Sequence, residues 1–224
     1  IAKLPYLEIA GIYSHFATSD KKDKSFAKLQ LERFNDIIER LKKKGVEIPL
    51  KHIANSGAIL DMRDSYFDMV RPGIMLYGYY PSKETSRSIS IEPVMTLKSK
   101  VIQKKNLRKG ASVSYGRTFI VENDSVIVSV PVGYADGYRR ELSNKGEVLI
   151  RGKRFPVVGT VCMNWIMIDI KDDNIIEEGD EVVLFGKQGN GCLDLLELCE
   201  KLNTIPYEIL TQVSQGIPRV YVNH

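Results

Sequence analysis

The stretch "SFAKLQLERFNDIIERLKKKGVEIPLKHIANSGA" (residues 25–58) decides the fold of the first part of this chain. Residues 25–45 carry apolar side chains at helical spacing, and Gly45 stands where a C-terminal helix cap belongs. The residues "LKHIAN" (50–55) then resemble a short strand, and a second helix is expected to begin near Ser56. The pattern therefore predicts a helix, a strand and another helix in succession. The apolar positions of the first helix are Phe26, Leu31, Phe34, Ile37, Ile38 and Leu41.

The flanking sequence repeats this alternation. "EIAGIYSHF" (8–16) is predicted to be a strand, and "FDMVRPGIMLYG" (67–78) a strand, a turn and a short helix. Strand–helix repetition indicates parallel βα units. A closed (β/α)₈ barrel needs ~250 residues, so residues 1–88 could be the C-terminal part of such a TIM-like barrel. Because the first residue is Ile1 and not Met, we expect the chain to be a piece of a longer protein.

The pattern changes after a polar segment, "PSKETSRSIS" (81–90), which is interpreted as a linker. Strand-like stretches now follow one another, and "RGKR" (151–154) is a good hairpin turn between two of them. One helix, "LDLLELCEKLN" (193–203), is predicted near the end. Residues 89–224 are therefore predicted to form a mostly antiparallel β domain.

Composition excludes several classes of function. Hydrophobic residues make up 43% of the 224 and charged residues 27%, which is typical of a soluble globular protein. The net charge of +4 is too small to indicate nucleic-acid binding. No apolar run is long enough for a membrane span. The three cysteines show no CxxC spacing, so we expect no disulfide framework, no metal site and a cytoplasmic location.

Polar residues follow three of the predicted parallel strands. His15 follows the first strand, Ser56 opens a helix after the second, and Arg71 ends the third just before Gly73 and Ile74. Active-site residues of α/β barrels gather at the carboxyl ends of strands, and helix N-termini hold phosphate well. Ser56, Gly73 and Ile74 are thus predicted to form an anion cradle. Each residue alone has a structural interpretation: a helix N-cap for Ser56, a surface charge for Arg71 and a core histidine for His15.

Tyr115 in "SVSYGRTF" (112–119) has two interpretations. A tyrosine directly before a glycine is common at the end of a hairpin. The same phenol could act as an acid or a base at the rim of a site. The local sequence does not choose between them.

Taken in order, seven motifs resemble those of the alanine racemase family: "SHFATSD", "HIANSGA", "MVRPGIMLYG", "SVSYGRTF", "VPVGYADGYRR", "VVGTVCMNWIMID" and "PYEIL". The resemblance covers essentially the whole chain. It implies a pyridoxal 5'-phosphate enzyme with an N-terminal (β/α)₈ barrel and a C-terminal β domain. It also implies that the lysine carrying the cofactor as a Schiff base lies in the part of the barrel that is absent here.

The resemblance assigns catalytic roles to three residues. Tyr115 resembles the family's catalytic tyrosine, the base opposite the lysine. His15 resembles the histidine bonded to that tyrosine. Arg71 resembles the arginine that contacts the pyridine nitrogen, and its permanent charge, together with His15, would favour phenolate at Tyr115.

Further residues are implied to bind cofactor and substrate. The expected contacts to the cofactor phosphate are Ser56, Gly73, Ile74 and Tyr207. Tyr134 and Met163 resemble substrate-side residues. In the family, Tyr115, Tyr134 and Met163 reach into the site of the partner subunit, so the resemblance implies a homodimer with shared active sites.

The implied function is the interconversion of L- and D-alanine by an isomerase with a two-base (Lys/Tyr) mechanism, supplying D-alanine for peptidoglycan. Asn164 and Gly216 depart from the residues that many family members carry there, and they raise serine as another substrate. The alternatives are a serine racemase domain of a membrane-anchored glycopeptide-resistance protein, an amino-acid decarboxylase of the same fold type, and a non-catalytic module that binds the same cofactor.

Overall fold

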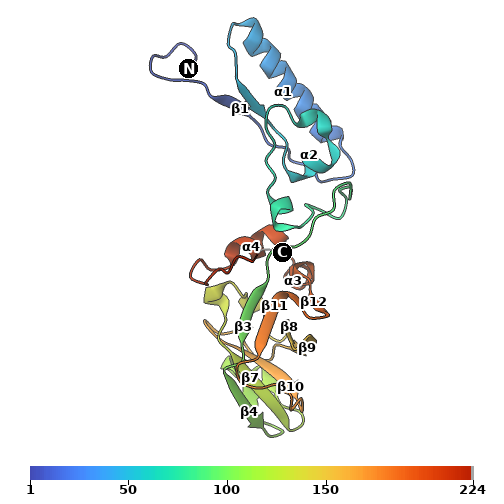
Figure 1. The fold of residues 1–224 in the computed structure, drawn as a ribbon, viewed down its shortest axis with the longest axis vertical. Helices are drawn as coiled ribbons and strands as arrows, with labels where there is room; N and C mark the ends of the chain where they lie inside the picture. Colours follow the sequence, from blue (N-terminus) through green and yellow to red (C-terminus); the bar gives the residue numbers. More distant parts are fainter. Residues whose placement is uncertain (223–224) are drawn as a thin grey trace. The chain divides into compact units, whose positions relative to one another are not determined.

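The computed structural model describes residues 1–222 and divides into two compact units, Ile1–Val94 and Met95–His224. Figure 1 shows the path of the chain through both units. Within the described residues, no helix combines the length and the apolar composition needed to cross a lipid bilayer. The prediction that the first domain ends at residue 88 stays a prediction.

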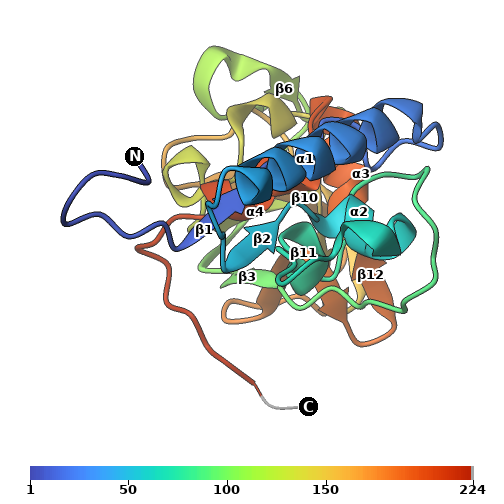
Figure 2. The same cartoon turned by 90° about the horizontal axis from the view of Figure 1, so that it is seen from above.

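Unit 1 is built on two parallel strands, β1 (Gly11–Tyr13) and β2 (Leu50–His52). Helix α1 (Ser25–Lys43) connects them and runs alongside both strands, as Figure 2 shows. Its buried residues Ala27 and Phe34 pack against Phe16 and Ile53, which explains the helical spacing of the apolar side chains. The connection is therefore the predicted parallel βα unit.

The C-terminal end of α1 matches the sequence pattern. After Lys44, Gly45 takes a positive φ of 72° and its N–H donates to the carbonyl of Lys42. This left-handed conformation costs glycine little and gives the helix a defined end. The predicted cap at Gly45 is confirmed.

The second helix, α2 (Ser56–Asp61), begins at the predicted residue but is capped differently. Asn55 is the N-cap, and its side-chain oxygen accepts the N–H of Ala58 at 3.2 Å. Ser56 is the first helical residue, so the structural interpretation of Ser56 as the N-cap is wrong. Asn and Ser are comparable N-caps, and the residue in extended conformation, here Asn55, takes the role.

The predicted third strand is reduced to one parallel bridge between Asn55 and Arg71. Around it the chain forms short 3₁₀ helices, η1 (Arg63–Ser65) and η2 (Ile74–Tyr77). The Pro72-Gly73 pair after Arg71 prevents a longer strand, because proline offers no N–H to a ladder.

The polar segment 81–90 is hydrogen-bonded to the rest of unit 1. The carboxylate of Glu84 accepts the backbone N–H of Lys22 at 2.8 Å, and the backbone N–H of Ser86 donates to Asp61 at 3.1 Å. Thr85 is buried. These hydrogen bonds hold the segment against α2 and the chain before α1, so it is not a free linker.

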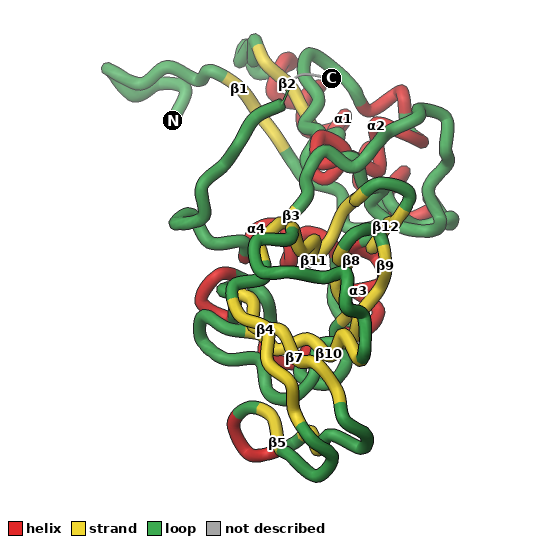
Figure 3. Tube along the Cα trace, turned by 60° about the horizontal axis from the view of Figure 1, so that its bottom comes forward, coloured by secondary structure: helices red, strands yellow, loops and turns green. Residues whose placement is uncertain are grey.

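Unit 2 consists of antiparallel sheets, drawn as yellow strands in Figure 3. One sheet has the order β10-β7-β4, and another has the order β12-β11-β8-β9 with β3 paired to β11. A small third pair joins β5 to β6. The strands are β3 (Leu97–Lys100), β4 (Gln103–Leu107), β5 (Ser112–Val113), β6 (Phe119–Ile120), β7 (Ser125–Val130), β8 (Glu147–Ile150), β9 (Lys153–Pro156), β10 (Ile166–Lys171), β11 (Glu181–Gln188) and β12 (Gly191–Leu193).

The hairpin predicted at "RGKR" is confirmed. Ile150 pairs with Lys153, and the two residues between them, Arg151 and Gly152, have φ of 51° and 76°. Two positive φ angles match the right-handed twist of the flanking strands. Arg151 also donates to both carboxylate oxygens of Asp180, at 2.7 and 2.9 Å.

Two helices follow the last strand of unit 2. The predicted helix is α3 (Leu195–Leu202), which begins at a capping box formed by Asp194 and Glu197. A further helix, α4 (Pro206–Gln212), is absent from the sequence prediction. Its proline, Pro206, stands at the first helical position, where proline is favoured because its missing N–H is not needed there.

Candidate active site

Arg71 is the centre of a polar cluster in unit 1. Its backbone N–H donates to the carbonyl of Ala54 at 2.9 Å, which places its side chain beyond the end of β2. Nη2 of its guanidinium donates to the carbonyl of Ser14 at 2.7 Å and contacts that of Ile53 at 3.4 Å. Backbone carbonyls from two neighbouring strand ends therefore fix the guanidinium.

His52 is the second member of the cluster. Nη1 of Arg71 donates to Nδ1 of His52, and the ring of Tyr13 stacks on the imidazole with centroids 5.4 Å apart. Burial and the adjacent Arg71 charge lower the pKa of His52. Because a guanidinium only donates, Nδ1 of His52 must accept, and the proton of the neutral ring lies on Nε2.

His15 is bound on the other side of the same guanidinium. Its Nδ1 lies 3.3 Å from Nη2 of Arg71. Nε2 itself lies 3.3 Å from Nδ2 of Asn55. The structure thus brings the predicted residues His15 and Arg71 into contact, and their catalytic roles stay predictions.

Ser56, Gly73 and Ile74 lie together at two helix starts. The buried hydroxyl oxygen of Ser56 accepts the N–H of Gly73 at 2.9 Å, immediately before η2 begins at Ile74. The first N–H groups of α2 and η2 have no partner within their own helices. The three residues therefore gather a hydroxyl and backbone donors in one place, as a cradle for an anion requires.

Tyr115 lies in the loop that joins β5 to β6, within the short helix η3 (Tyr115–Arg117). Its side chain is 75% exposed, while its carbonyl accepts the hydroxyl of Thr160 at 2.8 Å. Ser114, Gly116 and Arg117 have positive φ angles of 64°, 73° and 50°. This loop conformation, fixed from the backbone, presents the phenol outward and does not bury it in the hairpin.

Tyr134 and Met163 are neighbours through their backbones. Tyr134 lies in η4 (Tyr134–Asp136), and its N–H donates to the carbonyl of Cys162 at 3.0 Å. The N–H of Ala135 donates to the carbonyl of Met163 at 2.9 Å. The side chains of Tyr134 and Met163 are 44% and 56% exposed, so both remain available for contacts outside unit 2.

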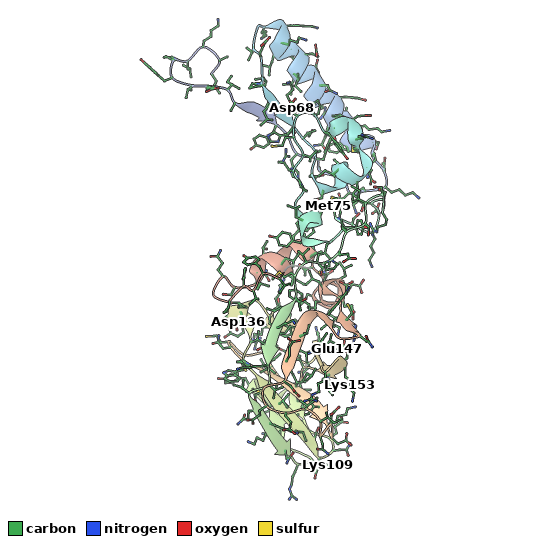
Figure 4. All side chains as sticks on the ribbon, in the orientation of Figure 1. Asp68, Met75, Lys109, Asp136, Glu147 and Lys153 are labelled. Atoms are coloured by element: carbon green, nitrogen blue, oxygen red, sulfur yellow. The ribbon has the colours of Figure 1, made fainter. Side chains whose placement is uncertain are left out.

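Tyr207 belongs to the same region of unit 2. It lies in the first turn of α4, and its carbonyl accepts the hydroxyl of Thr211 at 2.8 Å. The chain just after α4 bonds to the Tyr134 loop, because the N–H of Ser214 donates to the carbonyl of Asp136 at 3.1 Å. Asp136 is labelled in Figure 4.

The predicted site residues thus form one group in each unit. Unit 1 holds His15, Ser56, Arg71, Gly73 and Ile74, and its strand ends bring them together. Unit 2 holds Tyr115, Tyr134, Met163 and Tyr207. Backbone hydrogen bonds join the Tyr134 loop to the Met163 loop and to the residues just after α4, and the Thr160 hydroxyl bonds to the Tyr115 carbonyl.

His52 was missed as a member of the cluster. His52 is one of three histidines in the chain and ends a predicted strand, which was a usable signal. Its pairing with Arg71 depends on the parallel bridge between Asn55 and Arg71, which no local pattern contains.

Comparison with known proteins identifies the family. Residues 1–81 match the family described as "Alanine racemase, N-terminal domain", and residues 94–221 match "Alanine racemase, C-terminal domain". Among curated proteins, the chain is 50% identical over 222 residues to "Alanine racemase 2" of Caldanaerobacter subterraneus subsp. tengcongensis. It is 48% identical over 223 residues to "Alanine racemase" of Carboxydothermus hydrogenoformans.

Solved structures give the same result. The chain is similar to alanine racemase of Clostridium difficile 630, with a TM-score of 0.92 and 39% identity over 99% of this chain and 57% of that one. It is similar to the Bacillus anthracis alanine racemase "with bound L-Ala-P", with a TM-score of 0.92 and 38% identity over 98% of this chain and 56% of that one.

The two curated relatives are longer than this chain. The alignments cover 99% of the chain in both cases but 57% of the first relative and 61% of the second. With matches in both of its units, this chain belongs to the alanine racemase family.

Proposed function

We propose that this chain provides the C-terminal part of an alanine racemase that interconverts L- and D-alanine and supplies D-alanine for peptidoglycan. Residues 1–88 are the end of the (β/α)₈ barrel that binds pyridoxal 5'-phosphate, and residues 89–224 are the β domain. The main support for this proposal is the contact between Arg71 and His15 at the strand ends. It places a permanently charged guanidinium beside an imidazole, which is a group that can accept and donate protons near neutral pH.

The groups at the strand ends of unit 1 fit the cofactor. Ser56 Oγ already accepts from Gly73, so its own proton remains to be donated to a phosphate oxygen. A side chain at position 73 would find only Ser56 Oγ within 4.0 Å, which leaves room for a bulky anion. Ser56, Gly73, Ile74 and Tyr207 would hold the phosphate, and Arg71 the ring nitrogen.

Pyridoxal 5'-phosphate, when bound, withdraws electrons from the α-carbon of the amino acid and so makes its proton removable. The chain's own residues then supply position and charge. A guanidinium keeps its protons at every physiological pH, so Arg71 is a hydrogen-bond donor and not an acid. The carbonyls of Ser14 and Ile53 fix the direction of that donation.

In this proposal, the phenol oxygen of Tyr115 transfers the proton at one face of the substrate. A phenolate accepts a proton, and a phenol returns it. His15 is the residue that would stabilise the phenolate, and the guanidinium of Arg71 lies beside its Nδ1. The second proton-transfer group is a lysine, which the family resemblance places outside these residues.

The exposure of Tyr115, Tyr134 and Met163 supports a shared site in a homodimer. All three side chains are more than 40% exposed although they are aromatic or apolar. Aromatic residues and methionine are enriched at protein–protein interfaces. The substrate is alanine, and serine is the competing small amino acid to be tested beside it.

Tyr115→Phe in the intact gene product tests this function. Because the two enantiomers have equal free energy, kcat/KM must fall equally in both directions, by about 10² to 10⁴-fold for a lost acid/base group. Exchange of the α-proton with D₂O, followed by NMR, should survive for only one enantiomer, since the other face keeps its base. The absorbance of the bound cofactor should remain.

Tyr221→Phe is the matched control, since it removes the same atom from an exposed side chain and should leave the kinetics unchanged. Racemisation at the wild-type rate in Tyr115→Phe would exclude the assignment. So would an equal loss of exchange for both enantiomers.

A further inference from the structure

Ser114 has a backbone conformation that residues other than glycine rarely adopt, with φ of 64° and ψ of −177°. Such a conformation is strained, and it persists only where the surrounding structure holds it. Gly116 and Arg117, further along the same loop, also have positive φ angles, of 73° and 50°. Because Ser114 directly precedes Tyr115, this strained backbone sets the direction in which the phenol side chain starts.

Thr160 holds this loop with two hydrogen bonds of opposite direction. Its hydroxyl donates to the carbonyl of Tyr115 at 2.8 Å, and its own carbonyl accepts the hydroxyl of Ser114 at 2.6 Å. Because a carbonyl can only accept, the single hydroxyl proton of Thr160 is committed to Tyr115. Thr160 is only 7% exposed, so little water reaches these bonds. Two consecutive residues of the loop are thus fixed to one buried residue.

The segment that carries Thr160 is itself anchored. The side-chain oxygen of Asn144 accepts the N–H of Gly159 at 2.6 Å, and the NH₂ group of Asn144 donates to the hydroxyl of Thr118 at 3.0 Å. A Cβ on Gly159 would lie 2.8 Å from Cβ of Ser114, so the two segments pack in direct contact. The loop is therefore held at both of its ends, and Thr160 contacts the residue between them that matters for the site.

We propose that Thr160 is a positioning residue for Tyr115. Its hydroxyl holds the backbone of Tyr115 in the strained loop and so aims the phenol at one face of the substrate. This inference deepens the proposed function and rests on it, since the phenol is the proposed proton-transfer group. Thr160 acts only through the carbonyl of Tyr115 and exchanges no proton with the substrate.

Thr160→Val tests this role, because valine keeps the branched shape of threonine and replaces the hydroxyl by a methyl group. A misplacement of about 1 Å at a reacting group can lower the rate by about 10²-fold, so kcat/KM should fall by up to that factor in both directions. Exchange of the α-proton with D₂O should slow for the one enantiomer whose proton Tyr115 removes. A variant that merely lowers the folded fraction slows exchange of both enantiomers equally, so the ratio of the two exchange rates separates positioning from stability.

Two matched variants serve as controls. Thr160→Ser keeps the hydroxyl and should restore the wild-type ratio. Thr85→Val makes the same change at another buried threonine, 5% exposed, whose hydroxyl donates to the carbonyl of Ser82 at 3.1 Å, and it should leave the ratio unchanged. A wild-type ratio in Thr160→Val overturns the proposal, and so does an equal shift in Thr160→Ser.

A second measurement needs no turnover. In NMR relaxation of the isotope-labelled intact gene product, the order parameter of the Gly116 N–H should fall from about 0.85 in the wild type to below about 0.6 in Thr160→Val. An unchanged value overturns the proposal. If Thr160→Val fails to fold, Ser114→Ala removes the other hydrogen bond and is judged by the same two measurements. Absence of racemase activity in the wild type would refute the proposed function, while the Gly116 measurement would still decide whether Thr160 holds the loop.

Discussion

Gly133→Ala is predicted to separate two loops that carry site residues. A Cβ at position 133 would lie 2.2 Å from the carbonyl oxygen of Cys162 and 2.3 Å from that of Met163. Both atoms are backbone, so no side-chain rotation can relieve the clash. The carbonyls must move by roughly 1 Å to reach ordinary van der Waals contact. They are also the acceptors for the N–H groups of Tyr134 and Ala135.

The magnitude follows from these contacts. Two backbone hydrogen bonds are weakened, each contributing about 1 kcal/mol net. Overpacking adds about 1–3 kcal/mol. The free energy of unfolding should therefore fall by about 3–5 kcal/mol, a large fraction of the roughly 5–15 kcal/mol that holds a domain folded. With an m-value of about 2 kcal/mol per M, the urea midpoint should fall by about 2 M.

The assay is urea unfolding followed by the fluorescence of Trp165, the one tryptophan of the chain. Trp165 reports on the loop that contains Cys162 and Met163, because the carbonyl of Trp165 accepts the N–H of Cys162 at 2.9 Å. Gly216→Ala is the matched control: its Cβ would meet only Ser214 Oγ, at an ordinary 3.5 Å. An unchanged midpoint in Gly133→Ala, or an equal drop in the control, would refute the reasoning.

Two further predictions concern the polar side chains of Tyr138 and His52. The hydroxyl of Tyr138 is buried and has no hydrogen-bond partner within residues 1–222, and burial together with Glu147 raises its pKa. Tyr138→Phe should therefore leave the urea midpoint unchanged or raise the free energy of unfolding by about 1 kcal/mol, and a clear loss would reveal a missing partner. His52 has a pKa below its ordinary value through burial and Arg71, so the unfolded chain takes up a proton that the folded chain resists. Its contribution to stability is present above pH ~6.5 and is lost as the pH falls below it. Arg71→Met should raise the NMR titration midpoint of His52 and weaken this acid dependence, and a fall in the midpoint would contradict the assigned contact.

Local patterns were sufficient for the elements whose signal lies within a few residues. The helix over 25–45 followed from one apolar face, and the Arg151-Gly152 hairpin from its turn residues. The grouping of His15 with Arg71 followed from a general rule on strand ends. The helix at 206–212 was missed, because its pattern is short and its proline was not read as a start signal.

The sequence by itself determined the βα order of unit 1, the antiparallel character of unit 2 and the residue types available for the site. Only the tertiary structure decided that His52 shares Arg71 with His15, and that the segment 81–90 is hydrogen-bonded to the rest of unit 1. The physical reason is the range of the interactions. Helix periodicity and turn conformation depend on neighbours in sequence, whereas these hydrogen bonds join residues brought together by strand register and packing.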